Sequence, residues 1–132
     1  MPRPVVEVKG AKELRRAIRQ AGDSDLKLEL KKANREVADI VANEARTTIP
    51  VRSGALRETI RASGTLASGV VRTGTKRVPY AGVIHFGWPA RKIEPRPFLY
   101  EAADARVDEV VGRYETAIAA VTEKLARAGD VT

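Results

Sequence analysis

The fold is decided by one stretch of sequence, SDLKLELKKANREVADIVANEARTTI, which runs from Ser24 to Ile49. Its apolar residues recur every three or four positions, which places them on one face of an α-helix. These residues are Leu26, Leu30, Ala33, Val37, Ile40, Val41 and Ala45. Asp23 to Asp25 offer side-chain oxygens for the N-cap, and Pro50 cannot continue a helix. We therefore expect a long amphipathic helix over residues 24–49.

The residues before this helix predict a short strand and a short helix within residues 1–23. Val5 to Val8 is rich in β-branched residues, as strands are. Ala11 to Ala21 has Leu14, Ala17 and Ile18 at helical spacing, and Gly22 suits the C-terminal cap.

Beyond Pro50 the apolar rhythm changes towards period two, and glycines appear at positions 64, 69 and 74. This pattern predicts an antiparallel β-meander over residues 54–87. The candidate strands are Leu56 to Ser63, Gly69 to Thr75 and Tyr80 to Phe86. Gly54 to Arg57 could instead form a helical turn before the first strand, and this alternative stays open.

The last part of the chain predicts a loop over residues 88–96, a long helix over 97–128 and a disordered tail over 129–132. The apolar stripe of the helix is Leu99, Ala103, Val107, Val110, Tyr114, Ala117, Ile118, Val121, Leu125 and Ala128. About 30 helical residues span roughly 45 Å, whereas a domain of this size is roughly 35 to 40 Å across. One end of this helix should therefore project or lie along a partner.

Together these elements predict a single α+β domain over residues 1–132. It has a small antiparallel sheet of about three to four strands, packed with two long amphipathic helices and one short N-terminal helix. The chain is 43% hydrophobic and 31% charged, and no apolar run approaches the roughly 20 residues of a membrane span. We expect no membrane segment. The chain has no cysteine and no apolar N-terminal leader, so a cytoplasmic origin is expected.

The net charge of +7 is unevenly distributed. Residues 1–35 and 36–100 each carry 10 basic and 5 acidic residues, whereas residues 101–132 carry 4 basic and 7 acidic ones. A basic body could attract polyanions, or it could face the acidic last helix of a neighbouring subunit. The charge alone leaves both interpretations open.

The residues that catalysis or metal binding would need are scarce. One histidine and no cysteine exclude a His/Cys zinc cluster and a cysteine nucleophile. We therefore expect no catalytic residue, no metal, no cofactor and no enzymatic activity. The single histidine, His85, is interpreted as a packed or interface residue and not as a catalytic base.

Nucleic-acid binding is the alternative function, that of a small basic DNA-binding protein. A first basic stretch comprises Lys9, Lys12, Arg15, Arg16 and Arg19, and a second comprises Lys76, Arg77, Arg91, Lys92 and Arg96. Tyr80 and Trp88 lie near the second stretch and could stack on bases. Exposed faces of ordinary helices also carry lysine and arginine, and this interpretation is preferred for the first stretch. Trp88 is interpreted as a loop anchor for a neighbouring groove.

Three short segments carry motifs rich in turn-forming and aromatic residues. They are a Pro-x-x-Ser-Gly-x-Leu-Arg element at Pro50 to Arg57, a Tyr-Ala-x-x-x-x-x-Gly strand at Tyr80 to Gly87, and an Arg-Pro-Phe-Leu element at Arg96 to Leu99. In this order, between two long helices, they resemble the head-tail joining or tail-completion proteins in the neck of long-tailed phages. The lambda-type minor tail protein Z is related to that family. His85 departs from the family pattern, in which an acidic residue is common at this place.

The resemblance implies a non-enzymatic virion protein, located in the phage neck or tail. Such a subunit forms a homo-oligomeric ring, expected to be a hexamer, between adjoining connector and tail proteins. DNA would pass through the ring without sequence recognition.

Two groups of residues are the predicted sites. The candidate interface residues are Arg52, Arg57, Lys76, Arg77, His85, Trp88, Arg91, Lys92 and Arg96. The candidate structural residues of the motifs are Pro50, Gly54, Leu56, Tyr80, Gly87, Pro97 and Phe98. We expect Phe98 to belong to the core and Trp88 to serve assembly.

Overall fold

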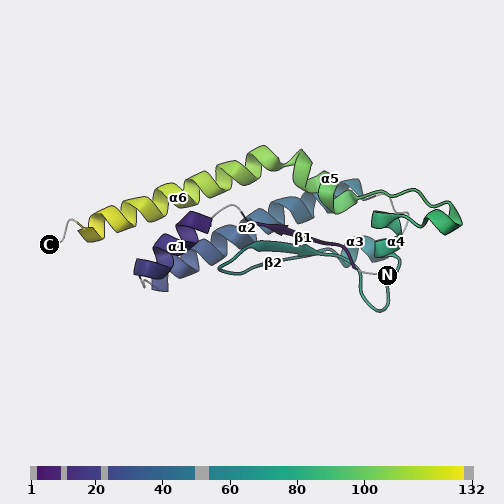
Figure 1. The fold of residues 1–132 in the computed structure, drawn as a ribbon, viewed down its shortest axis with the longest axis horizontal. Helices are drawn as coiled ribbons and strands as arrows, with labels where there is room; N and C mark the ends of the chain where they lie inside the picture. Colours follow the sequence, from purple (N-terminus) through teal and green to yellow (C-terminus); the bar gives the residue numbers. More distant parts are fainter. Residues whose placement is uncertain (1–2, 10–11, 22–23, 50–53, 130–132) are drawn as a thin grey trace.

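The computed structural model describes residues 3–9, 12–21, 24–49 and 54–129 (Figure 1). The elements follow one another as β1 (Val5–Val8), α1 (Lys12–Ala21), α2 (Ser24–Thr48), α3 (Gly54–Glu58), β2 (Arg61–Gly64), β3 (Gly69–Arg72), α4 (Ala81–Phe86), the 3₁₀ turn η1 (Pro89–Arg91), α5 (Phe98–Ala105) and α6 (Val107–Gly129). The fold is α+β, with a small antiparallel sheet and two long helices, as the sequence predicts.

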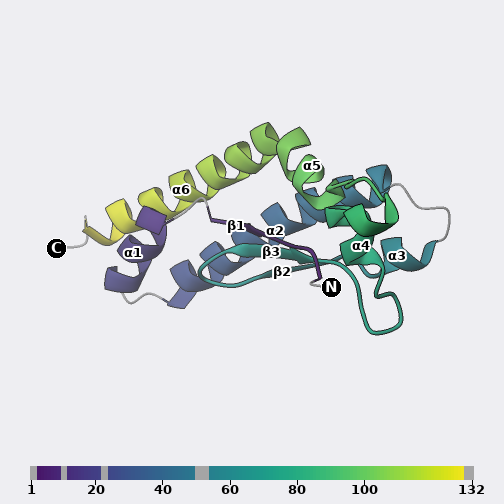
Figure 2. The same cartoon turned by 45° about the vertical axis from the view of Figure 1, so that its right-hand side comes forward.

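Helix α2 is the spine of the molecule, and the predicted apolar stripe is its buried face. Leu26, Leu30, Val37 and Val41 are fully buried, and Ile40 lies half-buried at the edge of the stripe. The sheet packs on one side of α2, and α5 and α6 pack on the other (Figures 1 and 2). The long helix therefore contributes to every layer of the fold.

The sheet has the strand order β1-β3-β2, and both of its pairings are antiparallel. One row across the sheet, Val6, Val71 and Ala62, faces the core. The neighbouring row, Val5, Arg72 and Arg61, is exposed. This alternation is the one expected of a sheet with a single covered face.

Two glycines bring the β2–β3 hairpin into direct contact with the main chain of α2. A Cβ at Gly64 would lie 2.5 Å from the backbone nitrogen of Arg35, and a Cβ at Gly69 would collide with the backbone oxygen of Asn34. Any larger residue would force the hairpin away from the helix. These glycines are packing residues, a role that the sequence interpretation did not assign to them.

Helix α6 runs antiparallel to α2. Arg106, just before α6, contacts Glu44, while Tyr114 within it contacts Asn34. Further along, Val121 joins Ile18, Leu26 and Leu30 in a second, smaller core between α1, α2 and α6. Up to Val121 the helix packs along α2, and its C-terminal end extends past α1 and the start of α2 (Figure 1), so one end of the last helix projects as predicted.

The structure corrects the predicted last helix, which is two helices. The break is at Arg106, with φ −114° and ψ 18°, and the Arg106 amide still donates to the carbonyl of Ala102 at 3.2 Å. The break allows α5 and α6 each to pack on α2. The local sequence holds no proline or glycine there to signal it.

The predicted strand Tyr80 to Phe86 is also wrong, because this segment is helix α4. An apolar run of this length fits a buried helix turn as well as a strand, and periodicity alone cannot separate the two. Its buried residues are Ala81, Gly82 and His85, the spacing of a helix face. The open alternative at Gly54 to Arg57 is resolved as helix α3, so the first strand is shortened to Arg61–Gly64.

Some predictions fall on residues outside the described ranges. They concern Gly22 and Asp23 as caps, Pro50 as a helix stop, Arg52 as an interface residue, and the tail beyond Gly129. Within the described ranges, no helix has the length and apolar character that crossing a bilayer requires.

Candidate interaction surface

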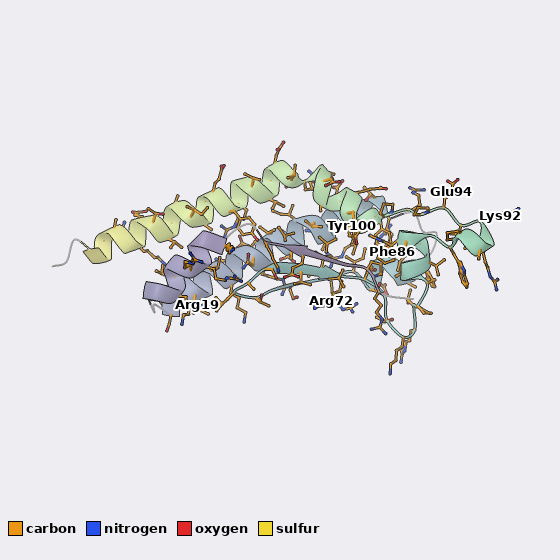
Figure 3. All side chains as sticks on the ribbon, in the orientation of Figure 1. Arg19, Arg72, Phe86, Lys92, Glu94 and Tyr100 are labelled. Carbon is orange, nitrogen blue, oxygen red and sulfur yellow. The ribbon has the colours of Figure 1, made fainter. Side chains whose placement is uncertain are left out.

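Large apolar side chains remain exposed at the end of the molecule formed by α4, η1 and the start of α5. Tyr80, Phe86, Trp88, Ile93 and Tyr100 each keep 37–46% of their surface accessible. Figure 3 shows Phe86 and Tyr100 close together, and their ring centroids are 6.4 Å apart. Such a concentration of exposed aromatic residues is typical of a docking surface.

His85 is packed beneath this surface and is only 1% exposed. Its ring makes edge contacts with Phe86, Phe98 and Tyr100, at centroid distances of 4.6, 5.2 and 4.5 Å. Neither ring nitrogen has a hydrogen-bond partner among the described residues. Burial lowers the pKa of His85 to about 4, so the ring is neutral at neutral pH. The ring is therefore enclosed by aromatic side chains, and no described group forms a hydrogen bond with it.

The loop over residues 88–96 is held in one conformation by main-chain hydrogen bonds. The Trp88 amide donates to the Ile93 carbonyl at 2.9 Å, and the Ile93 amide donates to the Trp88 carbonyl at 3.1 Å. The Arg96 amide donates to the carbonyl of Ile84 at 2.8 Å and ties the loop to α4. Gly87 has φ 75°, and a Cβ there would lie 2.8 Å from the Ile93 carbonyl oxygen. The loop is therefore exposed yet ordered.

The charge of this loop is positive. The Arg91 guanidinium lies 5.0 Å from the centroid of the Trp88 ring, within range of a cation–π contact. In the part of the chain that the structure describes, Arg91, Lys92 and Arg96 make no ion pair, and Glu94 is the loop's one acidic residue. We call Trp88, Arg91, Lys92, Ile93 and Arg96 the basic loop.

A second exposed surface lies on α5 and α6 and is acidic. Val107, Val111 and Ile118 are 41–52% exposed there. Asp104, Asp108 and Glu115 accompany them, exposed and without an ion pair to any residue within the described ranges. We call these six residues the acidic face.

The arginines near the acidic face are already paired elsewhere. Arg106 bonds Glu44 at 2.9 Å and Glu109 at 2.6 Å, and these carboxylates raise the pKa of its guanidinium. Arg113 pairs with Glu36, and Arg127 pairs with Glu123. The acids of the acidic face are thus left without these cations.

Residues 9–87 match the model of the HK97-gp10-like family, described as "Bacteriophage HK97-gp10, putative tail-component". The match covers more than half of the 132 residues. The chain belongs to this HK97-gp10-like family. No curated protein and no solved structure matches it.

The family match covers α1 to α4 and ends at Gly87. It includes the first two motifs, at Pro50 to Arg57 and Tyr80 to Gly87, and supports the phage resemblance as far as a tail-component family. The Arg96 to Leu99 motif, the basic loop and the acidic face lie beyond it. The family model therefore says nothing about these two surfaces.

The structure gathers part of the predicted interface into one place. Trp88, Arg91, Lys92 and Arg96 belong to the same ordered loop. Arg57 is exposed on α3, and Lys76 and Arg77 are exposed in the turn between β3 and α4. His85 is buried and is not available for contact in the isolated chain.

The structural motif residues have separate roles. Leu56 and Phe98 are core residues, as expected for Phe98. Gly87 allows the tight approach of the loop, and Pro97 precedes the first residue of α5. Gly54 is the first residue of α3. A Cβ placed there would meet no described atom outside its own helix within 4 Å, so packing does not require glycine at this position. Tyr80 stands at the N-terminus of α4 without capping it through its side chain.

The sequence predicted an acidic last helix, but it did not identify the exposed apolar residues of the acidic face. Val107 and Ile118 were expected in the buried stripe of the last helix, but both are exposed. Acidic residues are common near the start of a helix because they interact favourably with its dipole. The acidic neighbours of Val107 therefore did not indicate, from the sequence, that they lack ion-pair partners among the described residues. The detectable signal was an apolar stripe wider than one neighbouring helix can cover.

Among the described residues, no group of three or more His, Cys, Asp or Glu side chains could hold a metal ion.

Proposed function

We propose that this chain is a structural subunit of the phage head–tail junction, which assembles into a ring around passing DNA. Membership of a phage tail-component family supports a place in the virion. The three motifs support the finer position, a neck or tail-completion protein related to the lambda-type minor tail protein Z. The subunit is made in the host cytoplasm, has no enzymatic activity, and joins connector and tail proteins.

The observation that carries the ring proposal is the presence of two unlike, unpartnered surfaces on one subunit. The basic loop lies in the loop around η1, whereas the acidic face lies on helices α5 and α6, and the two carry opposite charge. Two different patches are what a head-to-tail contact needs, and such a contact repeated with rotation closes a ring. A hexamer is the expected size.

Mass measurement tests this proposal directly. Purified protein at micromolar concentration, alone and mixed with connector or tail proteins of its phage, is examined by sedimentation velocity and by electron microscopy. We expect discrete rings or a stable complex. A strict monomer that joins none of these proteins would overturn the proposal.

A second function, DNA binding, is favoured by the basic N-terminal region. Lys9, Lys12 and Arg15 line a hollow of about 300 Å³ next to Ala67 at the hairpin tip. Concave cationic surfaces suit phosphate groups. If this region binds duplex DNA, the affinity falls steeply with salt, whereas the lack of binding at low salt would dismiss this function.

A further inference from the structure

The basic loop and the acidic face are both incomplete in the isolated chain. The basic loop leaves Trp88 and Ile93 exposed, and the acidic face leaves Val107, Val111 and Ile118 exposed. The loop lies at one end of the molecule, whereas α6 runs away from it towards the other end (Figures 1 and 2). Figure 3 shows Lys92 and Glu94 at the outer limit of the loop end. One chain therefore does not bring its own two surfaces together.

The two surfaces have matching chemistry. At 100° per residue, Val107, Val111 and Ile118 lie within about 40° of one another around α6, which makes a narrow apolar stripe. Asp108 and Glu115 both fall on one flank of this stripe, about 10 Å apart along the helix. The loop presents an indole and an isoleucine side chain next to Arg91 and Lys92. In a specific protein–protein contact, apolar side chains from both partners usually meet at the centre. Charged side chains of one partner then face opposite charges of the other at the rim.

We infer that the basic loop of one subunit docks on the acidic face of a second copy of this chain. The inference rests on the proposed ring and names the contact that would build it. The unpaired cations and the unpaired carboxylates are on the same polypeptide, so a second copy supplies the complement of each. Because main-chain bonds already order the loop, docking costs little conformational entropy.

Charge reversal with mixing tests this contact. The loop variant is Arg91→Glu with Lys92→Glu, and the helix variant is Asp108→Lys with Glu115→Lys. Each variant alone places like charges across the contact, and we expect its dissociation constant for self-association to rise about a hundredfold or more. A matched control, Lys31→Glu with Lys32→Glu on the exposed side of α2, changes the same charge elsewhere and should assemble like the wild type.

An equal mixture of the loop variant and the helix variant should assemble again. In an alternating ring, every reversed loop meets a reversed helix, and every unchanged loop meets an unchanged helix. A chain that carries all four substitutions should assemble for the same reason. Restoration by mixing is specific for contact between copies, because an unrelated partner would not be changed by it.

A cross-linking measurement accompanies the charge variants. The chain has no cysteine, so Ile93→Cys and Val111→Cys each introduce the only thiol of their chain. Mixed and mildly oxidised, the two variants should give more dimer of unlike chains than either variant alone gives of like chains. Thermal melting of every variant shows that it is folded, so loss of assembly is not loss of structure.

The outcomes separate this inference from the proposed function. If the wild type forms rings and both charge-reversed variants form them equally well, the loop-to-helix contact is wrong while the ring stands. If each variant loses assembly and neither mixing nor the combined variant restores it, the basic loop and the acidic face do not contact each other and the inference is wrong. If the wild type forms no oligomer under any condition, both the contact and the ring are wrong.

Discussion

The centre of α2 and the loop end of the molecule differ in whether their buried polar side chains form hydrogen bonds. At the centre, buried Asn34 donates to the Thr65 carbonyl and accepts from the Tyr114 hydroxyl, both at 2.7 Å. At the loop end, the ring nitrogens of His85 are the only buried side-chain polar atoms without a partner among the described residues. The contrast teaches that the centre is complete in one chain, whereas the loop end has the features of a surface to be covered.

The largest expected effect is a difference in stability loss between variants of Phe98 and Trp88. Phe98 belongs to the core, whereas Trp88 belongs to the exposed surface at the loop end. Phe98→Ala removes a ring that is 2% exposed and should lower the free energy of unfolding by about 3–5 kcal/mol. Trp88→Ala, at 39% exposed, should lower it by about 1 kcal/mol or less and mainly weaken assembly. Urea denaturation of both variants measures the difference. Equal losses of stability in the two variants would show that the assignment of Phe98 to the core and of Trp88 to the contact surface is wrong.

Acidification should weaken the loop end through His85. The folded pKa is about 4 and the ordinary value is 6.5, so the unfolded chain takes up this proton first as the pH falls. Its contribution to stability is complete above pH 6.5, declines between pH 6.5 and 4 and then levels off, with a total of about 3 kcal/mol. Stability measured against pH should show this slope.

The variant His85→Phe is the matched control for this titration. It keeps a ring among Phe86, Phe98 and Tyr100 but cannot be protonated. Carboxylates titrate in both proteins, so the difference between the two curves isolates the histidine. Parallel curves from pH 6.5 to 4 would show that the ring is not buried as described.

The centre of α2 should be sensitive to the loss of a single hydroxyl. Tyr114→Phe leaves the Asn34 Oδ1 atom buried without this donor and should cost about 1–3 kcal/mol. Tyr100→Phe removes a hydroxyl from an exposed ring and should change stability by about 0.5 kcal/mol or less. Thermal denaturation compares the pair. A similar effect at both sites would contradict the idea that the Tyr114 hydroxyl has a buried partner whereas the Tyr100 hydroxyl is exposed to solvent.

The smallest expected effect is a gain of stability at Gly112. No described atom lies within 4 Å of a Cβ placed there, so Gly112→Ala should stabilise α6 by about 1 kcal/mol. Gly69→Ala is the opposite case, because its Cβ would meet the main chain of α2, and it should destabilise the protein. Calorimetry of the two variants checks the signs. A loss of stability at Gly112 would indicate a neighbour that the structure does not place there.

Much of the fold was accessible from the sequence because its signals are local. The helix over 24–49 and the strand at Val5 to Val8 follow from periodicity and residue type within a few turns or positions. The strand predicted over Tyr80 to Phe86 was wrong because a short apolar run fits a strand or a buried helix. Only the packing of this segment selects the helix. The close approach at Gly64 and Gly69 depends on a helix about thirty residues earlier, which no local rule includes.

The candidate site divides in the same way. Trp88, Arg91 and Lys92 were accessible from composition and from the prolines around them. The acidic character of the last helix was accessible from its charge count. The lack of ion pairs between the acidic face and other described residues was not, because it depends on distant pairings such as Arg113 with Glu36 and Arg106 with Glu44. Val107 and Ile118 had the right period for burial, but α2 covers a narrower face of α6 than the apolar pattern provides.

The contact of Gly64 and Gly69 with α2 has a mechanical consequence. Side chains can change rotamer and so absorb a small displacement, but touching main chains cannot. We therefore expect the hairpin and α2 to move together as one unit. A displacement of α2 caused by a partner should then also displace the exposed face of the sheet.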